Sequence, residues 1–531
     1  MSTENWIRPA VERRDNACVV MLSPDRWLDY TQTTQWFSLL LDGPTKTIVP
    51  TLMQGNDFPG AYYFDFKGRT ETLLWATGPC DWRRLRFEVR VEGDRTVFGL
   101  FGHDGAALPA GITVEAVQRP RPCVPTPWEA LRVLMDTSFE LWPLPTPSGP
   151  APDWRAIATR TLADLAKPEC QNAQTGQRGY NSYVVTGHGR GVPSPRLEAF
   201  VQLDIALGLA RWAKAHGDPA AAAEAAHMVG LTKLFYTPRL GLFENYHPAS
   251  DFLAAGDTPD HWPPPRPGQK PRRIGNTWYQ LHVLEKVFQL AALSGDRELT
   301  AMAVRTLDTY RALATDFHYV LPLFMDMANV EGCGGGMDVY AAGILALCLA
   351  HAARLEPGRA DELLAESATA LSVARRFPPG VCVHEPIGLA NAVSAADALH
   401  RHSADPEHRE WRDDFLRLLL MMMYRQPPLT GLFQACGGLL YPAFKENVEV
   451  LWAIAQARQA GDAPAALPVR TILEHQFRNN LAYFDGQPPD AIPYEELPTR
   501  ELPGQRGMLG KEVYGAGQVF DLALIQARGL L

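Results

Sequence analysis

Apolar helical segments, rich in small residues, recur six times along the chain, each introduced by a polar or glycine-rich loop. More polar, amphipathic helical segments lie between them. This alternation predicts a two-layer ring of helices, with the apolar set inside and the amphipathic set outside. The apolar segments begin near Leu197, Asn276, Met337, Gly388, Glu446 and Glu512, and the amphipathic segments cover 154–165, 220–235, 298–314, 360–376, 407–424 and 468–481. The predicted fold class is mainly α, an (α/α)6 toroid.

The connections between the two sets of helices differ in length. An inner segment is joined to the next outer segment by a short turn such as His216-Gly217-Asp218, and Gly beside Asp typically ends one helix and begins the next. The outer-to-inner connections are long and rich in aromatic residues, His, Glu and Asn. In an alternating antiparallel ring these long loops all emerge at one end, and long loops in compact domains are usually functional. We therefore expect a binding cleft at that end.

The N-terminal region has a different periodicity. Short runs rich in β-branched and aromatic residues are separated by turn signals, and residues 84–105 alternate as a half-buried hairpin does. We predict an antiparallel β-sandwich-like domain over 1–120, a Pro-rich linker with a short helix over 121–153, and the toroid over 154–531. We expect the β domain to have a structural role at the rim of the ring. Its fold does not by itself indicate a function.

Composition excludes several classes of partner. The chain has 531 residues, of which 46% are hydrophobic and 21% charged, as in an ordinary soluble protein. A formal net charge of −9 disfavours nucleic acid and anionic membranes as partners. No apolar run has the length of a membrane span, and the N-terminus does not read as a secretory signal. We predict a cytoplasmic protein with a small-molecule or oligosaccharide substrate; homo-oligomerisation stays open.

Motifs for metals and cofactors are missing from the sequence. The eight cysteines are dispersed without a CxxC pair, which favours reduced thiols over a zinc cluster or a disulfide framework. The chain has no GxSxG elbow, Walker loop, dinucleotide-binding fingerprint or HExxH motif. We predict no metal and no cofactor.

Acids, histidines and aromatics concentrate at the predicted entrances of the inner helices. Trp278 and His282 are four residues apart and so share a helix face, where Trp suits a sugar ring and His suits proton transfer. Polar groups pack badly in an inner layer unless they line a cavity. The candidate catalytic residues are Glu244, His247, His282, Glu331 and Asp338. The candidate substrate-binding residues are Tyr180, His188, Tyr246, Asn276, Trp278, Tyr279, His384, Glu385, Glu446 and Tyr514.

The region from Trp154 to the C-terminus resembles the (α/α)6-toroid carbohydrate-active enzymes, which include glycoside hydrolases, polysaccharide lyases and sugar epimerases. The likeness is architectural, and no complete catalytic motif of these families is legible. The segment 276–296 looks like the Tyr/His-bearing helix of uronyl C5-epimerase-type domains. The segment 215–250 is similar to a helix and loop of linalool dehydratase-isomerase, whose paired active-site cysteines have no evident counterparts in this chain.

Four functions follow from these features. The first is a glycoside hydrolase that uses two carboxyl groups, one as acid and one as base or nucleophile. The second is a lyase or epimerase on uronic-acid sugars, in which Tyr and His move the proton. The third is a terpenoid dehydratase, isomerase or cyclase whose aromatics stabilise positive charge. The fourth is a non-catalytic glycan-binding protein. We favour the hydrolase, because acids and aromatics dominate the long loops.

Overall fold

The structure is a computed structural model. It describes residues 6–21, 58–65, 68–78, 85–92, 95–172, 178–185, 197–245, 274–327, 330–332, 336–380, 385–435, 441–459, 467–484, 491–498 and 510–528. Two of the predicted strand segments, 37–43 and 45–53, lie outside these residues. Among the described residues, no helix has both the length and the apolar character needed to cross a membrane.

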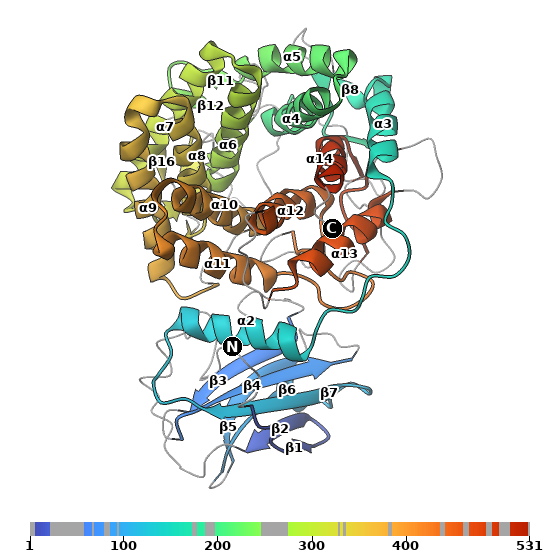
Figure 1. The fold of residues 1–531 in the computed structure, drawn as a ribbon, viewed down its shortest axis with the longest axis vertical. Coiled ribbons are helices and arrows are strands. Elements are labelled where there is room, and N and C mark those ends of the chain that lie inside the picture. The colour runs from blue at the N-terminus through green and yellow to red at the C-terminus, as the bar shows by residue number, and fades with distance from the viewer. Residues whose placement is uncertain are drawn as a thin grey trace, which may run out of the picture.

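Two concentric layers of helices form the larger part of the molecule (Figure 1). The outer helices are α3 (Trp154–Leu165), α5 (Pro219–Lys233), α7 (Arg297–Asp316), α9 (Ala360–Arg376), α11 (Pro406–Leu420) and α13 (Val469–Asn479). The inner helices are α4 (Ala199–His216), α6 (Thr277–Ser294), α8 (Ala341–Leu355), α10 (Pro386–Ser403), α12 (Phe444–Gln459) and α14 (Gly515–Ala527). Each inner helix contacts the next, and α14 contacts α4, which closes the ring. The predicted (α/α)6 toroid is confirmed.

Local sequence explains where the helices begin and end. Asp218 and Asp296 accept hydrogen bonds from backbone N–H groups in the first turns of α5 and α7, as N-cap residues do. Gly217 and Gly295 close α4 and α6 with φ of 66° and 67°, a conformation that Gly adopts without strain. The Gly-Asp pairs are therefore the predicted stop and restart signals.

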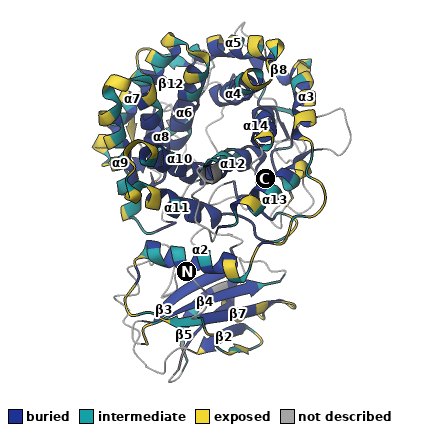
Figure 2. Cartoon of the chain, in the orientation of Figure 1, coloured by how far each residue is buried: buried dark blue, intermediate teal, exposed yellow. Residues whose placement is uncertain are grey.

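Burial distinguishes the two layers as the hydrophobic pattern predicts. The inner helices are buried over most of their length, whereas the outer helices expose one face to solvent (Figure 2). Small residues let neighbouring inner helices approach closely. A Cβ added to Gly208 of α4 would lie 2.6 Å from the carbonyl oxygen of Gly517 in α14. The small-residue composition of the apolar segments therefore sets the packing distance within the ring.

Short strands from the outer-to-inner connections pair with one another. Tyr183 of β10 (Tyr183–Val185) pairs with Glu512 of β18 (Lys511–Glu512), and β13 (Ile274–Asn276) pairs with β15 (Phe324–Asp326). An isolated bridge also joins Ala443 to Glu496. Because these pairs connect loops that precede different inner helices, the described parts of those loops meet at one end of the ring, as we expected.

The N-terminal strands form two antiparallel sheets. One contains β1 (Val11–Arg13), β2 (Ala17–Met21), β6 (Arg95–Gly102) and β5 (Leu85–Glu92), in that order; the other contains β3 (Gly60–Asp65), β4 (Thr70–Thr77) and β7 (Thr113–Pro120). The predicted hairpin is the β5–β6 pair. Apolar side chains from both sheets share one core, which makes the unit a sandwich.

Helix α2 (Pro127–Leu141) joins the β sandwich to the ring. Trp75 of β4 stacks on Trp142 with ring centroids 5.1 Å apart. On the other side, α2 packs against outer helix α11, and Arg417 donates two hydrogen bonds to Asp136 at 2.8 and 2.9 Å. The sandwich therefore rests against the outer layer, while the interior of the ring is formed by the six inner helices (Figure 1).

Candidate functional site

Carboxyl groups stand at the N-terminal ends of five of the inner helices. Their side chains are buried or partly buried at the end of the ring where the long connections meet. The five residues, in ring order from α4 through α8, α10 and α12 to α14, are Glu198, Asp338, Glu385, Glu446 and Glu512. In a closed ring the first turns of the inner helices converge on the axis. Carboxyl groups that are far apart in the sequence are thereby brought into one electrostatic environment, which we name the carboxyl ring.

Three acids of the carboxyl ring, Glu385, Glu446 and Glu512, and the nearby Glu495 form a group of buried carboxyl groups with few hydrogen-bond partners. Among the described residues, one oxygen each of Glu385 and Glu446 has no hydrogen-bond partner, whereas the hydroxyls of Tyr183 and Tyr514 act on Glu495 and Glu512. Burial is the largest cause that raises the pKa of Glu385, Glu446, Glu495 and Glu512, and repulsion among the acids adds to it. These groups share protons and titrate together rather than one by one.

Glu385 and Glu446 stand at the entrances of adjacent inner helices. The charge of Glu446 is the largest electrostatic cause that raises the pKa of Glu385 well above its usual range. Lys445 favours ionisation of Glu446, because its Nζ lies 3.8 Å from Glu446 Oε1. Both side chains keep some exposure, whereas Glu512 is fully buried. The pair therefore combines a neutral acid with a more easily ionised one on adjacent helices α10 and α12.

Aromatic side chains surround these charges. Lys445 Nζ lies 3.6 Å from the ring centroid of Phe200, and Tyr279 stacks on the same ring with centroids 4.5 Å apart. The Tyr279 hydroxyl donates to Glu198 Oε1 at 2.8 Å. The hydroxyls of Tyr183 and Tyr514 are 3.2 Å apart. Flat aromatic faces next to acids and hydroxyls are the side-chain set that suits a polyhydroxylated ring.

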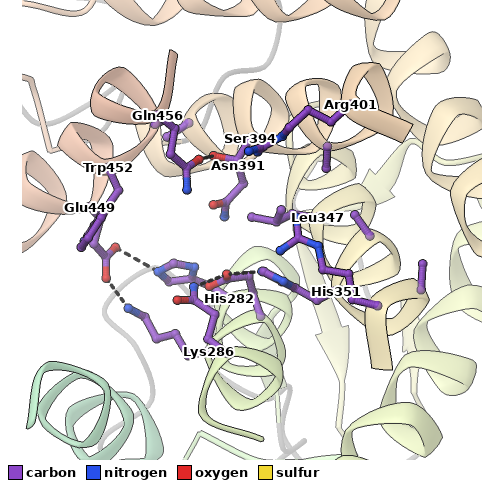
Figure 3. Close-up of a pocket in the computed structure, with 18 of the residues that line it drawn as sticks. His282, Lys286, Leu347, His351, Asn391, Ser394, Arg401, Glu449, Trp452 and Gln456 are labelled. Carbon is purple, nitrogen blue, oxygen red and sulfur yellow. Dashed lines mark hydrogen bonds and ion pairs between the residues drawn. The ribbon is translucent and has the colours of Figure 1, made fainter. Parts of the chain in front are cut away.

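A polar network lies deeper along the axis and is centred on Glu449 of α12. Glu449 accepts hydrogen bonds from His282 Nε2 at 2.9 Å, from Gln518 Nε2 at 3.3 Å and from Lys286, and Lys445 Nζ lies 3.4 Å from it. Figure 3 shows the bonds to His282 and Lys286. These cations and donors outweigh the effect of burial and hold the pKa of Glu449 well below its usual range. Glu449 is therefore an ionised hub.

Burial and the neighbouring lysines favour a neutral imidazole at His282, whereas Glu449 favours the protonated form and is outweighed. Burial is the largest cause that lowers the pKa of His282 below 6.5, and Lys286 and Lys445 act in the same direction. Because the Glu449 carboxylate only accepts, Nε2 carries the proton and Nδ1 presents a lone pair. No hydrogen-bond partner for Nδ1 is found among the described residues. The geometry is that of a base oriented by a carboxylate.

A cavity of about 760 Å³ begins at this network and follows the axis of the ring. His282, Lys286 and Glu449 lie at its inner end, as Figure 3 shows. Asn391 of α10 lies at the same level, and most of the other lining residues come from later turns of the inner helices, including Trp452 and Arg354. The cavity therefore extends from the central network toward the C-terminal ends of the inner helices, away from the carboxyl ring.

The structure brings several of the sequence candidates together near the axis. Asp338, Glu385, Glu446 and Tyr514 lie at the inner-helix entrances, and Trp278, Tyr279 and His282 follow on α6. Trp278 and His282 have ring centroids 6.4 Å apart, as their spacing of four residues predicts. Asn276 precedes the first turn of α6 as its N-cap residue. Their roles toward a substrate stay predictions.

Other candidates have different surroundings. The Tyr180 hydroxyl donates to Glu224 of outer helix α5 at 2.8 Å, which ties it to the outer layer. Glu331 is exposed on the short strand β16 (Glu331–Gly332). Glu244 accepts a hydrogen bond from Thr237 across the hairpin β11–β12 (Tyr236–Thr237 and Leu242–Phe243). None of these three is in the lining of the axial cavity. The candidates His188, Tyr246, His247 and His384 lie outside the described residues.

Sequence reasoning selected His282 but not Glu449 or its lysine partners, Lys286 and Lys445. Lys286 lies one helical turn beyond His282, and Lys445 lies one turn before Glu449, so both share a face with a polar neighbour. Charged residues inside an apolar inner segment are the signal that would have found them, because burial of an unpaired charge is costly. Glu495 precedes the last inner helix in a stretch that carried no predicted element.

A metal site needs several His, Cys, Asp or Glu ligands close together. In the part of the chain that the structure describes, no group of three or more His, Cys, Asp or Glu side chains has an arrangement that could hold a metal. The four described cysteines, Cys18, Cys123, Cys170 and Cys348, are free thiols.

Comparisons with known proteins relate the chain to others through its architecture. No protein-family model matches it, and no curated protein is similar in sequence. Its structure is similar to a sugar epimerase from a ruminal bacterium, at 12% identity and a TM-score of 0.48 over 70% of this chain and 98% of the other.

Two further solved structures have the same degree of similarity. The cellobiose 2-epimerase of Spirochaeta thermophila is 13% identical, with a TM-score of 0.47 over 72% of this chain and 100% of the enzyme. A family 76 glycoside hydrolase from a bovine Bacteroides thetaiotaomicron strain is 8% identical, with a TM-score of 0.49 over 87% of this chain and 84% of the other. At this level the likeness concerns the fold, and the function rests on the residues of this chain.

Proposed function

We propose that the protein is a carbohydrate-active enzyme that hydrolyses a glycosidic bond at the carboxyl ring. The observation that carries the proposal is the pair Glu385 and Glu446, two partly exposed acids at the entrances of adjacent inner helices, each with one oxygen that has no hydrogen-bond partner among the described residues. Glycoside hydrolysis needs one carboxyl group that holds a proton and one that is ionised. Burial and repulsion supply the first condition at Glu385, and Lys445 favours the second at Glu446 against the burial that raises the pKa of that group.

The roles follow from these protonation states. Glu385 donates its proton to the oxygen of the leaving sugar, and Glu446 acts on the opposite side as general base or nucleophile. Phe200, Tyr279 and Tyr514 offer aromatic faces and a hydroxyl near the pair. Glu495 and Glu512 act through the pair, because their charges help to raise the pKa values of the group.

A second function is favoured by the state of His282. A neutral imidazole whose Nδ1 lacks a partner among the described residues, and whose Nε2–H is fixed by Glu449, suits removal of a proton from carbon. Such a base would support epimerisation or isomerisation of a sugar. The cavity that His282 lines has a volume of about 760 Å³, which is in the range of small-molecule sites.

The two functions are separated by their products. The full-length protein is incubated in deuterium oxide with a panel of oligosaccharides and monosaccharides, and the products are followed by NMR. Hydrolysis releases new reducing ends without deuterium at carbon. Epimerisation or isomerisation places deuterium on the sugar carbon without breaking the glycosidic bond. Carbon-bound deuterium without new reducing ends would overturn the hydrolase proposal in favour of the second function.

Substitutions then test the acid pair. Glu385→Gln and Glu446→Gln should each lower the turnover of the hydrolysed substrate by about 10²–10⁴-fold, the contribution of general acid–base catalysis. Glu169→Gln, an exposed acid on the outer side of the ring, is the matched control and should leave turnover unchanged. If Glu385→Gln retains normal turnover while His282→Gln does not, the carboxyl pair is not the catalytic pair.

A further inference from the structure

The axial cavity is lined by basic side chains at its outer end. There, arginines from three inner helices or their C-terminal ends line it, together with His402. Arg354 is near the end of α8, Arg401 near the end of α10, and Arg528 directly follows α14. This end lies opposite the carboxyl ring, on the side where short turns connect inner to outer helices. The two ends of the ring axis therefore differ in the sign of their side-chain charge.

Most charges in the cavity are balanced by a neighbour. Glu285 pairs with His351 at 3.1 Å, and Asp521 accepts two hydrogen bonds from Arg211 at 2.8 and 2.7 Å. Glu449 forms ion pairs with Lys286 and Lys445. Arg401 forms an ion pair with Asp397, one helical turn before it. Each carboxylate of the lining is thus already engaged by a cation or a histidine.

Arg354 and Arg528 are the exceptions. Neither forms an ion pair with a carboxylate among the described residues, and both side chains are exposed at the mouth of the cavity. Partial desolvation, and the neighbouring Arg401 cation, lower the pKa of Arg354 below its usual range. The partial negative charges of helix C-termini account for a preference for basic residues at these positions. They do not account for the N–H groups of Asn391 and Trp452, which lie deeper in the cavity and have no hydrogen-bond partner among the described residues.

The orientation of Arg528 is fixed by an aromatic ring. The guanidinium carbon of Arg528 lies 4.9 Å from the ring centroid of Trp452, and that of Arg211 lies 5.2 Å from the same ring. Stacking of this kind leaves the guanidinium N–H groups available for an acceptor. Among the described residues, Trp452 Nε1 and Asn391 Nδ2 also have no hydrogen-bond partner, although both residues line the cavity. The cavity thus offers donors without acceptors.

We propose that this cavity is a second binding site, separate from the carboxyl ring, for a sugar-sized organic anion. The phosphate or carboxylate of the ligand lies at the mouth, where Arg354 and Arg528 supply uncompensated positive charge. Its hydroxyl or carbonyl oxygens accept from Asn391 and Trp452 farther in. Guanidinium groups bind phosphate and carboxylate through paired, charge-assisted hydrogen bonds, which makes them the appropriate side chains for this ligand.

Calorimetric titration of the full-length protein tests the site with three probes of similar size. Glucose 6-phosphate carries a phosphate, glucuronate carries a carboxylate, and glucose carries neither. We expect one or both anions to bind and glucose to bind far more weakly. Binding should weaken as salt is added, since the charges at the mouth are exposed to screening. Whichever anion binds more tightly identifies the charged group that the site takes.

Variants locate the binding. Arg354→Gln and Arg528→Gln should each weaken the tighter anion by about 10- to 100-fold, the worth of a hydrogen bond to a charged group. Arg155→Gln, an exposed arginine on outer helix α3, is the matched control and should not change the affinity. Thermal melts with and without the anion show that each variant is folded.

The result is independent of the hydrolase proposal, because it measures binding and not turnover. Glu385→Gln should bind the anion as the unchanged protein does. Equal affinities for glucose and for both anions would overturn the second site. So would an affinity that is lost in Glu385→Gln but retained in both arginine variants, because the anion would then occupy the carboxyl ring.

Discussion

Asp338 and Glu449 show how the surroundings of a buried carboxyl group set its protonation state. Glu449 is contacted by two lysines and His282, and these hold its pKa well below the usual range. Among the described residues, Asp338 accepts hydrogen bonds from the backbone N–H groups of Tyr340 and Ala341 alone, at 3.0 and 3.1 Å, so burial prevails and raises its pKa to about 7. Two buried carboxyl groups therefore differ in protonation state because their partners differ.

This difference predicts a pH-dependent stability for Asp338→Asn. Between the unfolded pKa of 3.8 and the folded pKa of about 7, folded Asp338 keeps a proton that the unfolded chain has lost. Its contribution to stability is therefore fully present below that range and falls as the pH rises through it. Asparagine retains the acceptor oxygen but does not ionise. Thermal melts across the range should show that the stability of Asp338→Asn rises relative to that of the original protein as the pH rises. A difference in stability that does not change with pH would contradict the shift in pKa.

At the scale of elements, the spacing of the inner helices depends on glycines where two helices touch. Gly208 of α4 faces the backbone of Gly517 in α14. These helices also carry Asp204, an ion-pair partner of Lys286, and Gln518, which donates to Glu449. Helix packing and the polar network on the axis are therefore coupled, because a shift of either helix moves a partner of the network.

Gly208→Ala should accordingly destabilise the ring. The new Cβ would lie 2.6 Å from the Gly517 carbonyl oxygen, and overpacking of this kind costs about 1–3 kcal/mol. Gly230→Ala is the control, because Gly230 is exposed on outer helix α5 with no atom near a new Cβ. That change should stabilise by about 0.5–1 kcal/mol, since alanine favours a helix. Urea denaturation of both variants measures the difference, and equal effects would show that α4 and α14 can separate freely.

The whole molecule depends on the contact between the β sandwich and the ring. Arg425, which follows outer helix α11, is buried there. Its guanidinium group donates to the Trp142 carbonyl at 2.7 Å and to Ser138 Oγ at 3.1 Å, and it lies 4.5 Å from the ring centroid of Trp75. Burial lowers the pKa of Arg425 to about 9. One side chain thus connects the sheet, α2 and the ring.

Arg425→Ala should therefore lower the stability of the whole protein by about 3 kcal/mol or more, because it leaves buried acceptors unsatisfied and opens a cavity. Arg376→Ala, an exposed arginine at the end of outer helix α9, is the control and should change stability by less than about 0.5 kcal/mol. Denaturation followed by both tryptophan fluorescence and circular dichroism measures the loss. Equal stabilities of the two variants would mean that the contact contributes little.

The sequence by itself determined the layers of the ring. Apolar periodicity distinguishes inner from outer helices, and Gly-Asp turns mark their ends, because these signals act within a few residues. The position of acids before the inner helices, such as Glu385 and Glu446, was equally legible. Spacing along one helix also predicted that Trp278 and His282 lie together.

Only the tertiary structure decided which of these groups act on one another. His282 and Glu449 are 167 residues apart, and no local pattern relates them. Tyr180 has the same residue type and loop setting as other candidates, yet its hydroxyl bonds to outer helix α5. Protonation states depend on burial and on charges brought from distant segments. They therefore became readable only once the ring had closed and brought His282 and Lys286 of α6 to Glu449 of α12.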